Sequence, residues 1–140
     1  MSPRTRVETR GRARVLQALY AWDLRGAEPL DRIAERIFDD LAVAPDERRF
    51  ANLLIRTLLV ELPGVDADLA EVTTNWRLER LGAIERSVLR LAAAELRRGD
   101  APPRVVIQEA VRLAERYGTA RSARFVNGVI DGLARRMGRI

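Results

Sequence analysis

Apolar residues recur every three or four positions along almost the whole chain, which is the spacing of an α-helix with one buried face. No stretch alternates apolar and polar residues cleanly enough to predict a strand. Together with proline and glycine near the expected ends, this period predicts helices in almost every segment. They cover residues 10–24, 29–41, 45–62, 65–75, 83–98, 104–117 and 121–137.

Helix-breaking residues divide these predicted helices into two groups. Pro63-Gly64 interrupts the pattern in the middle of the chain, and a short turn from Trp76 to Gly82 separates two later helices. We therefore predict an all-α fold of about seven helices in two small helical bundles. The bundles cover residues of about 10–62 and 65–140, and together they form one compact domain over residues 1–140.

The last predicted helix carries an aromatic residue beside its core face. The core face is a stripe formed by Val126, Val129, Ile130, Leu133 and Met137. Phe125 lies about 90° from the centre of this stripe, with Arg121 and Arg124 on its other side. A ring beside two guanidinium groups suits single-stranded RNA, because the ring stacks on a base and the arginines contact phosphates. Packing of Phe125 at the edge of the core is an equally good interpretation.

The first predicted helix has a similar arrangement. Its buried stripe is formed by Val15, Leu19 and Trp22, whereas Arg10, Gln17 and Tyr20 lie on roughly the opposite side, flanked by Arg14. Tyr20 therefore does not need to be a core residue. The alternative is a solvated face on which a neighbouring helix covers Tyr20.

Composition excludes several classes of protein. The chain of 140 residues is 47% hydrophobic and 32% charged, which is typical of a globular domain. It has no Cys and no His, and all 25 basic residues are Arg, so a thiol nucleophile, an imidazole base and a phosphate-binding lysine are excluded. No apolar run is long enough to span a membrane, and the N-terminus lacks a secretory signal. We therefore expect a cytoplasmic protein.

Basic charge is concentrated at the two ends of the chain. The formal net charge is +5, and residues 1–14 contain five arginines against a single acid, Glu8. We predict that residues 1–9 form a flexible Arg-rich arm and that this cluster binds a nucleic acid. A merely solvated tail is the alternative, and the use of Arg in place of Lys is attributed to genome composition.

The residues reveal no catalytic or metal site. The acidic pairs Asp39-Asp40 and Asp46-Glu47 are typical of solvated helix ends, and Ser122 has no histidine partner. Glu95, within a run of apolar residues, is expected to be a partly buried, paired carboxylate, because an unpaired one would be costly there. We predict no cofactor, no metal and no enzymatic activity.

Four segments of the chain resemble the NusB family of transcription antitermination factors. They are Arg12-Ala-Arg-Val-Leu-Gln-Ala-Leu-Tyr20, Leu81-Gly-Ala-Ile-Glu-Arg-Ser-Val-Leu-Arg-Leu91, Val106-Ile-Gln-Glu-Ala-Val-Arg-Leu-Ala114 and Phe125-Val-Asn-Gly-Val129. They occur in the family's order and span nearly the whole chain. The resemblance implies an all-α RNA-binding protein that is not an enzyme.

The resemblance also implies partners and a role. Members of the family bind the BoxA element of ribosomal RNA leader transcripts as a heterodimer with NusE, which is also a small-subunit ribosomal protein. The pair helps RNA polymerase to read through terminators. Family RNA contacts come from an Arg-rich N-terminus and from the residues matched here by Tyr20, Glu85 and Phe125. Relatives differ in self-association, so a homodimer stays open, and the residues that contact NusE are not assigned.

Two departures from the family pattern affect the predicted site. Glu8, Thr9 and Gly11 interrupt the N-terminal arginines, and of these arginines Arg10 and Arg12 align best. At Arg121 some relatives carry an acid, so an arginine there is expected to make RNA binding tighter and less discriminating. The predicted RNA-binding residues are Arg6, Arg10, Arg12, Arg14, Tyr20, Glu85, Arg121, Arg124 and Phe125.

Three other functions remain to be compared with RNA binding. The main alternative is a helical protein-interaction module that does not bind RNA itself. NusB-like domains also precede the catalytic domain of some ribosomal RNA cytosine methyltransferases, but no cofactor-binding domain follows before Ile140, which argues against this function. Duplex DNA binding would need a recognition helix with base-reading side chains, and the sequence reveals none.

Overall fold

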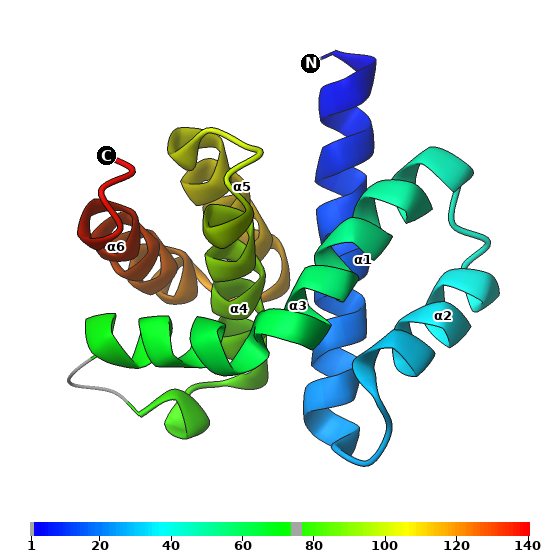
Figure 1. Ribbon diagram of the computed structural model, residues 1–140, viewed down its shortest axis with the longest axis horizontal. Helices are drawn as coiled ribbons and strands as arrows, with labels where there is room; N and C mark the ends of the chain where they lie inside the picture. The colour runs from blue at the N-terminus through cyan, green and yellow to red at the C-terminus, as the bar shows by residue number, and fades with distance from the viewer. Residues whose placement is uncertain (1, 74–76) are drawn as a thin grey trace.

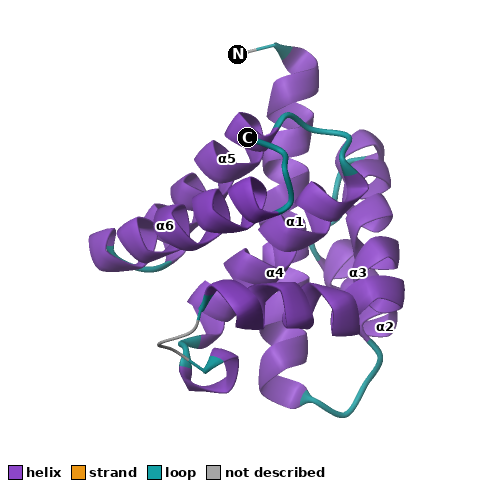
Figure 2. Cartoon of the chain, turned by 60° about the vertical axis from the view of Figure 1, so that its left-hand side comes forward, coloured by secondary structure: helices purple, strands orange, loops and turns teal. Residues whose placement is uncertain are grey.

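The computed structural model describes residues 2–73 and 77–140, so Trp76 and the end of the helix predicted over residues 65–75 lie outside the described part. All regular structure within these residues is helical (Figures 1 and 2). The elements are α1 (Pro3–Arg25), α2 (Leu30–Asp40), α3 (Pro45–Val72), the 3-10 helix η1 (Leu78–Arg80), α4 (Ala83–Arg98), α5 (Pro103–Tyr117) and α6 (Ala120–Arg136). The predicted all-α fold is confirmed, although α3 is one helix where two were expected.

The helices form two small bundles that share α3 (Figure 1). Helices α1 and α2 pack against the first part of α3, whereas α4, α5 and α6 pack together on the side of its second part. Helix α4 lies between the bundles and contacts α1, α3, α5 and α6, and its residues 91–96 are all buried. The apolar core therefore runs continuously from one bundle into the other.

Helix α1 begins at Pro3, well before the predicted start at residue 10. The Ser2 hydroxyl caps the helix by accepting a hydrogen bond from the Thr5 backbone N–H at 3.1 Å, and proline suits the first helical turn. Further along, the Thr9 hydroxyl donates to Glu109 of α5 at 2.6 Å. The prediction of a flexible arm over residues 1–9 is therefore wrong for residues 3–9, because a Ser-Pro cap extends the helix to the start of the chain.

Helix α3 continues through Pro63-Gly64, where a break was predicted. Pro63 is exposed, and buried Val65 and Leu69 continue the core stripe that Leu58 belongs to. Tertiary packing on both sides thus keeps the segment helical, although a proline removes one backbone hydrogen bond and clashes with the preceding turn. The helix changes direction in its middle, as expected of a proline kink (Figure 1).

A buried ion pair joins α1 to α4. The Arg12 side chain is 2% exposed, and its Nε and Nη2 donate to the two carboxylate oxygens of Glu95 at 2.6 and 2.9 Å. Glu109 of α5 lies 3.6 Å from Nη1, and the Phe50 ring centroid lies 5.2 Å from the guanidinium carbon. Burial acts to lower the pKa of Arg12, but the hydrogen bonds to Glu95 and the charges of both acids outweigh it and raise the pKa.

The two acids beside Arg12 are both buried. Glu95 is a buried, paired carboxylate, as predicted. The helical period alone would group Glu109 with Arg112 and Arg116 on the polar face of its helix, but it is only 7% exposed, because α5 turns it toward Arg12 and Thr9 of α1.

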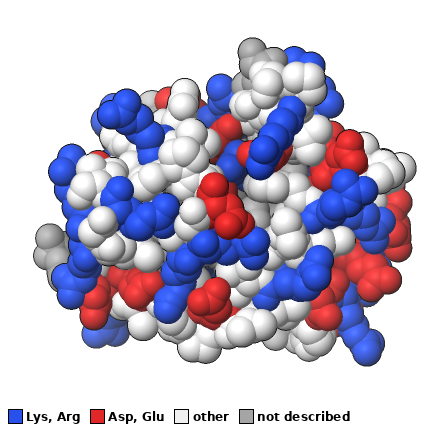
Figure 3. Space-filling view, turned by 45° about the horizontal axis from the view of Figure 1, so that its top comes forward, with Lys and Arg blue, Asp and Glu red and all other residues white. Residues whose placement is uncertain are grey.

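Arginines and acids are interleaved over much of the surface. On the face drawn in Figure 3, basic and acidic side chains alternate rather than form one basic patch. Many of the arginines are held by acids of this chain, such as Arg48 by Asp39 at 2.6 Å and Arg136 by Glu71 at 2.7 Å. The positive net charge therefore does not by itself mark a binding surface on this face.

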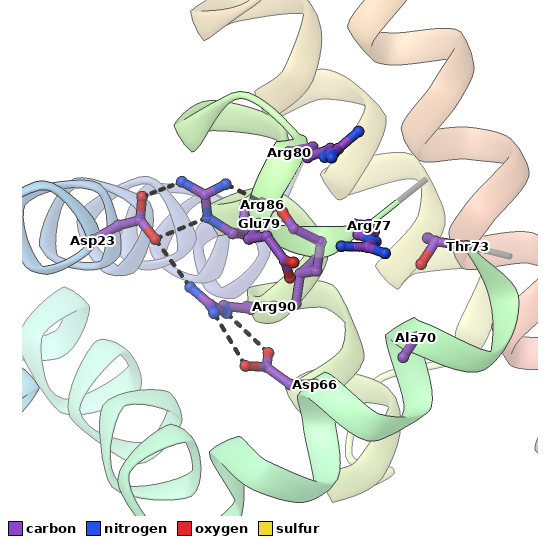
Figure 4. A pocket seen from close by; sticks show the side chains of 10 residues that line it. Asp23, Asp66, Ala70, Thr73, Arg77, Glu79, Arg80, Arg86 and Arg90 are labelled. Atoms are coloured by element: carbon purple, nitrogen blue, oxygen red, sulfur yellow. Dashed lines mark hydrogen bonds and ion pairs between the residues drawn. The ribbon is translucent and has the colours of Figure 1, made fainter. Parts of the chain in front are cut away.

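A second ion-pair network lines a hollow of about 1050 Å³ between α1, α3 and α4 (Figure 4). Asp23 of α1 accepts hydrogen bonds from Arg86 and Arg90 of α4, and Arg90 also donates to both carboxylate oxygens of Asp66 of α3 at 2.9 and 3.0 Å. The hydrogen bonds from Arg86 lower the pKa of Asp23, against the opposing effect of burial, and the charges of both arginines add to this.

Replacing Arg12 with Met is expected to destabilise the protein by about 3–5 kcal/mol, because the buried carboxylate of Glu95 loses its partner. Urea unfolding followed by circular dichroism measures the change. Arg4→Met is the matched control, since the Arg4 side chain is 89% exposed in its pair with Glu8, and it is expected to change stability by less than about 1 kcal/mol. Equal unfolding midpoints for the two variants would contradict the structural role of Arg12.

Replacing Asp23 with Asn is expected to make the free energy of unfolding less dependent on pH in the acidic range. The pKa of Asp23 is lower in the folded chain than in the unfolded chain, so its stabilisation is present above the unfolded pKa and is lost as the pH falls through the folded value. We expect the free energy of unfolding to fall less steeply below about pH 4 in Asp23→Asn than in the unchanged protein. Urea titrations at several acidic pH values measure this, with exposed Asp31→Asn as the control. If the free energy of unfolding falls equally steeply with decreasing pH in Asp23→Asn and in the unchanged protein, Asp23 makes no such contribution.

Candidate nucleic-acid interface

A groove of about 390 Å³ lies between the N-terminal ends of α4 and α6. One side is formed by η1 and the residues that lead into α4, and the other by the first turns of α6. The lining residues are Arg80, Leu81, Gly82, Glu85, Thr119, Arg121, Ser122 and Phe125. Only Gly118 and Thr119 separate α5 from α6, so the start of α6 has little freedom to move away from the groove.

The start of α6 is fixed by its cap and by a bond to α4. The Thr119 hydroxyl accepts from the Ser122 backbone N–H at 3.1 Å, and the Ser122 hydroxyl accepts from the Thr119 backbone N–H at 3.3 Å. The Ser122 hydroxyl also donates to Glu85 Oε1 at 2.9 Å. This contact across the groove holds the carboxylate of α4 against the first turn of α6.

Glu85 has one carboxylate oxygen to offer a ligand. Among the described residues, no side chain or backbone group donates to its Oε2. A Cβ atom at Gly82 would lie 2.6 Å from this oxygen, so the glycine leaves the space that the carboxylate occupies. The groove therefore contains a hydrogen-bond acceptor held in place through its other oxygen.

The predicted residues of α6 occupy different positions relative to this groove. Phe125 is half-buried and packs against the core, as one interpretation of its ring predicts, and it also lines the groove. Arg121 is exposed and lines the groove. Arg124 is exposed but does not line it. The structure thus brings Glu85, Arg121 and Phe125 together, as the predicted site requires.

The predicted residues of α1 do not line this groove. Tyr20 is 38% exposed, and Arg6 and Arg10 are exposed, with Arg10 lying 3.7 Å from Glu47 of α3. Arg14 is half-buried and lies 3.8 Å from the same carboxylate. These side chains remain at least partly accessible on α1, although they are separate from the groove as its lining defines it.

The prediction that Arg12 contacts RNA is wrong in this structure. Its guanidinium is buried and saturated by Glu95, with Glu109 close by, so no phosphate reaches it. The sequence places Arg12 among solvent-facing arginines, and only the position of α4 and α5 reveals that its acidic partners lie inside the protein.

Sequence reasoning missed Arg80. It is exposed and lines the groove on the side opposite the first turns of α6. The available signal was its place immediately before the segment that begins at Leu81, which is one of the four that resemble a known family. The turn was treated as a connection, so its side chains were not considered.

The described residues have neither a metal-binding cluster nor a membrane-spanning helix. No group of three or more acidic, histidine or cysteine side chains in residues 2–73 and 77–140 is placed to hold a metal ion. Within the same residues, no helix combines the length and apolar character needed to cross a membrane.

Comparisons with known sequences agree on one family. A family model described as the NusB family matches residues 9–135. The transcription antitermination protein NusB of Anaeromyxobacter dehalogenans (strain 2CP-1) is 43% identical over 129 residues, which cover 90% of this chain and 89% of that protein. The corresponding protein of Sorangium cellulosum (strain So ce56) is 38% identical over 131 residues, which cover 93% of each chain.

Solved structures share the fold over nearly the whole chain. NusB from T. maritima matches with a TM-score of 0.85 and 36% identity, covering 96% of this chain and 92% of that one. A structure of the antitermination factors NusB and NusE in complex with dsRNA matches with a TM-score of 0.82 and 28% identity, covering 96% of this chain and 99% of that one. Since the family model spans most of the chain and the relatives are similar along about nine tenths of their length, the chain belongs to the NusB family of transcription antitermination proteins.

Proposed function

We propose that this protein binds BoxA-type RNA of ribosomal RNA leader transcripts together with NusE and thereby promotes read-through by RNA polymerase. The observation that carries the proposal is the groove in which Phe125, Arg121 and Glu85 lie together in a chain of the NusB family. A solved relative in complex with NusE and dsRNA supports the same pair of partners.

The three groove residues offer complementary contacts to a flexible RNA strand. The partly exposed ring of Phe125 provides a face on which an unpaired base stacks. The guanidinium of Arg121 contacts a phosphate, and Glu85 Oε2 accepts a hydrogen bond from the amino group of a base. Stacking and phosphate contacts supply affinity, whereas the carboxylate discriminates among bases.

The accessible residues of α1 extend the proposed contact beyond the groove. Tyr20 offers a second ring, and Arg6, Arg10 and Arg14 offer positive charge along the same helix. Arg124 adds a further exposed guanidinium on α6. Because Arg10 and Arg14 lie near Glu47, RNA competes with this acid for them, and we assign the larger share of phosphate contact to Arg121 and Arg124.

RNA binding measured with and without NusE tests the proposal. Fluorescence anisotropy with a BoxA-like single strand, its scrambled form and a duplex is expected to give tightest binding of the BoxA-like strand when NusE is present. With about four to six phosphate contacts, the logarithm of affinity is expected to fall with the logarithm of salt concentration at a slope of about −3 to −4. Equal binding of the scrambled strand, or an affinity that salt does not change, would contradict the proposal. A folded protein that ignores all three RNAs even with NusE would favour a protein-interaction module.

Replacing each proposed stacking ring with leucine is expected to weaken RNA binding by about 1–3 kcal/mol. Leucine fills the half-buried space of Phe125 and covers the surface at Tyr20, but it provides no flat face for a base. Thermal unfolding of Phe125→Leu and Tyr20→Leu, followed by circular dichroism, is the control for folding, and we expect the melting temperatures to change little. A lowered melting temperature with unchanged RNA affinity would show that the ring serves only the core.

A further inference from the structure

The side of the groove formed by η1 carries an exposed arginine, Arg80. Arg80 is exposed, and within the described residues its guanidinium forms no ion pair and no hydrogen bond. Arg80 also borders the hollow of Figure 4, but its side chain points away from Asp23 and Arg90 there. An unpaired guanidinium in a groove is available to an anionic ligand, and its planar donors match a phosphate.

The position of η1, which carries Arg80, is fixed by a side chain of α4. Arg86 of α4 donates through Nη1 to the backbone carbonyls of Leu78 and Leu81 at 3.2 and 2.6 Å. Its Nε and Nη2 donate to the two oxygens of Asp23 of α1. The carbonyls on both sides of Arg80 are therefore fixed to two helices by one guanidinium, so Arg80 projects from a preorganised position rather than from a loose loop.

The charges in the groove favour an anion that spans it. Arg80 lies on one side and Arg121 on the other, and Glu85 is the acid among the lining residues. The two cations thus exceed the acid by one formal charge. A strand with regularly spaced phosphates satisfies both guanidinium groups, while a base stacks on Phe125 in the same groove.

We propose that Arg80 is a further RNA-binding residue, which contacts a phosphate across the groove from Arg121, and that Arg86 positions it. This inference rests on the proposed function, because it assigns a second phosphate contact to the same groove. It predicts that η1 takes part in binding.

The salt dependence of RNA binding tests Arg80 directly. The full chain with NusE is titrated with the BoxA-like strand at several salt concentrations, as the unchanged protein and as Arg80→Gln. Loss of one phosphate contact on a single strand makes the slope less steep by about 0.7, which corresponds to about fivefold weaker binding at 0.1 M salt if the two lines meet at 1 M. Arg56→Gln, at an exposed arginine of α3 outside the groove, is the matched control and is expected to leave the slope unchanged.

Arg121→Gln separates the failure of this inference from the failure of the proposed function. If its slope becomes less steep while that of Arg80→Gln does not, the assignment of Arg80 is wrong and the groove remains the RNA site. If RNA binds but neither variant changes the slope, the groove is not the site and both proposals fall. If the unchanged protein with NusE does not bind this RNA, both proposals are likewise overturned.

A double-mutant cycle tests the positioning role of Arg86. Arg86→Lys retains a positive charge near Asp23, but a lysine ammonium cannot reproduce the fork that holds Asp23 and the two carbonyls. We expect Arg86→Lys to weaken RNA binding several-fold in the unchanged protein and much less in Arg80→Gln, because the two residues act through the same contact. Equal losses in both backgrounds, with unfolding monitored in parallel, would show that Arg86 does not act through Arg80.

Discussion

The arrangement of the helices depends on one constraint, which is the buried bidentate ion pair between Arg12 and Glu95. A guanidinium with almost no exposure is stable only if acceptors surround it, and Glu95 of α4 and Glu109 of α5 supply them. The contact fixes the rotation of α1, because Arg12 must face both acids. The outward direction of Tyr20 and Arg10 on the same helix follows from that rotation. An internal requirement for charge neutrality thus determines which side chains of α1 are available to a partner.

Hydrophobic spacing was sufficient to predict most of the helices but not their ends. Periodicity identified the buried stripes of α1 and α6 correctly, since Val15, Leu19, Val126 and Ile130 are all buried. It failed at Pro63, where packing on either side outweighs the local cost of proline. It also failed at Pro3, where the capping hydroxyl of Ser2 starts a helix in a segment with little apolar character. Both failures arise where a local signal competes with contacts or caps that a period does not measure.

The fate of each arginine was harder to predict than the position of each helix. Arg12 and Arg10 belong to the same helix and to the same cluster in sequence, yet one is buried against Glu95 and the other is exposed. The difference depends on acids more than 80 residues away, which no local pattern contains. The grouping of Glu85 with Phe125 came from a family resemblance and has a structural basis in the short link between α5 and α6. The contribution of Arg80 depends on the path of a turn, which spacing does not describe.

The continuity of α3 has a mechanical consequence. One helix belongs to both bundles. It is kinked at Pro63, and each of its two halves is packed into the core. A flexible linker at this point would let the two bundles move relative to one another, whereas a continuous helix keeps the distance between them constant. A ligand long enough to contact both bundles therefore has to adapt its own conformation to a fixed distance between them.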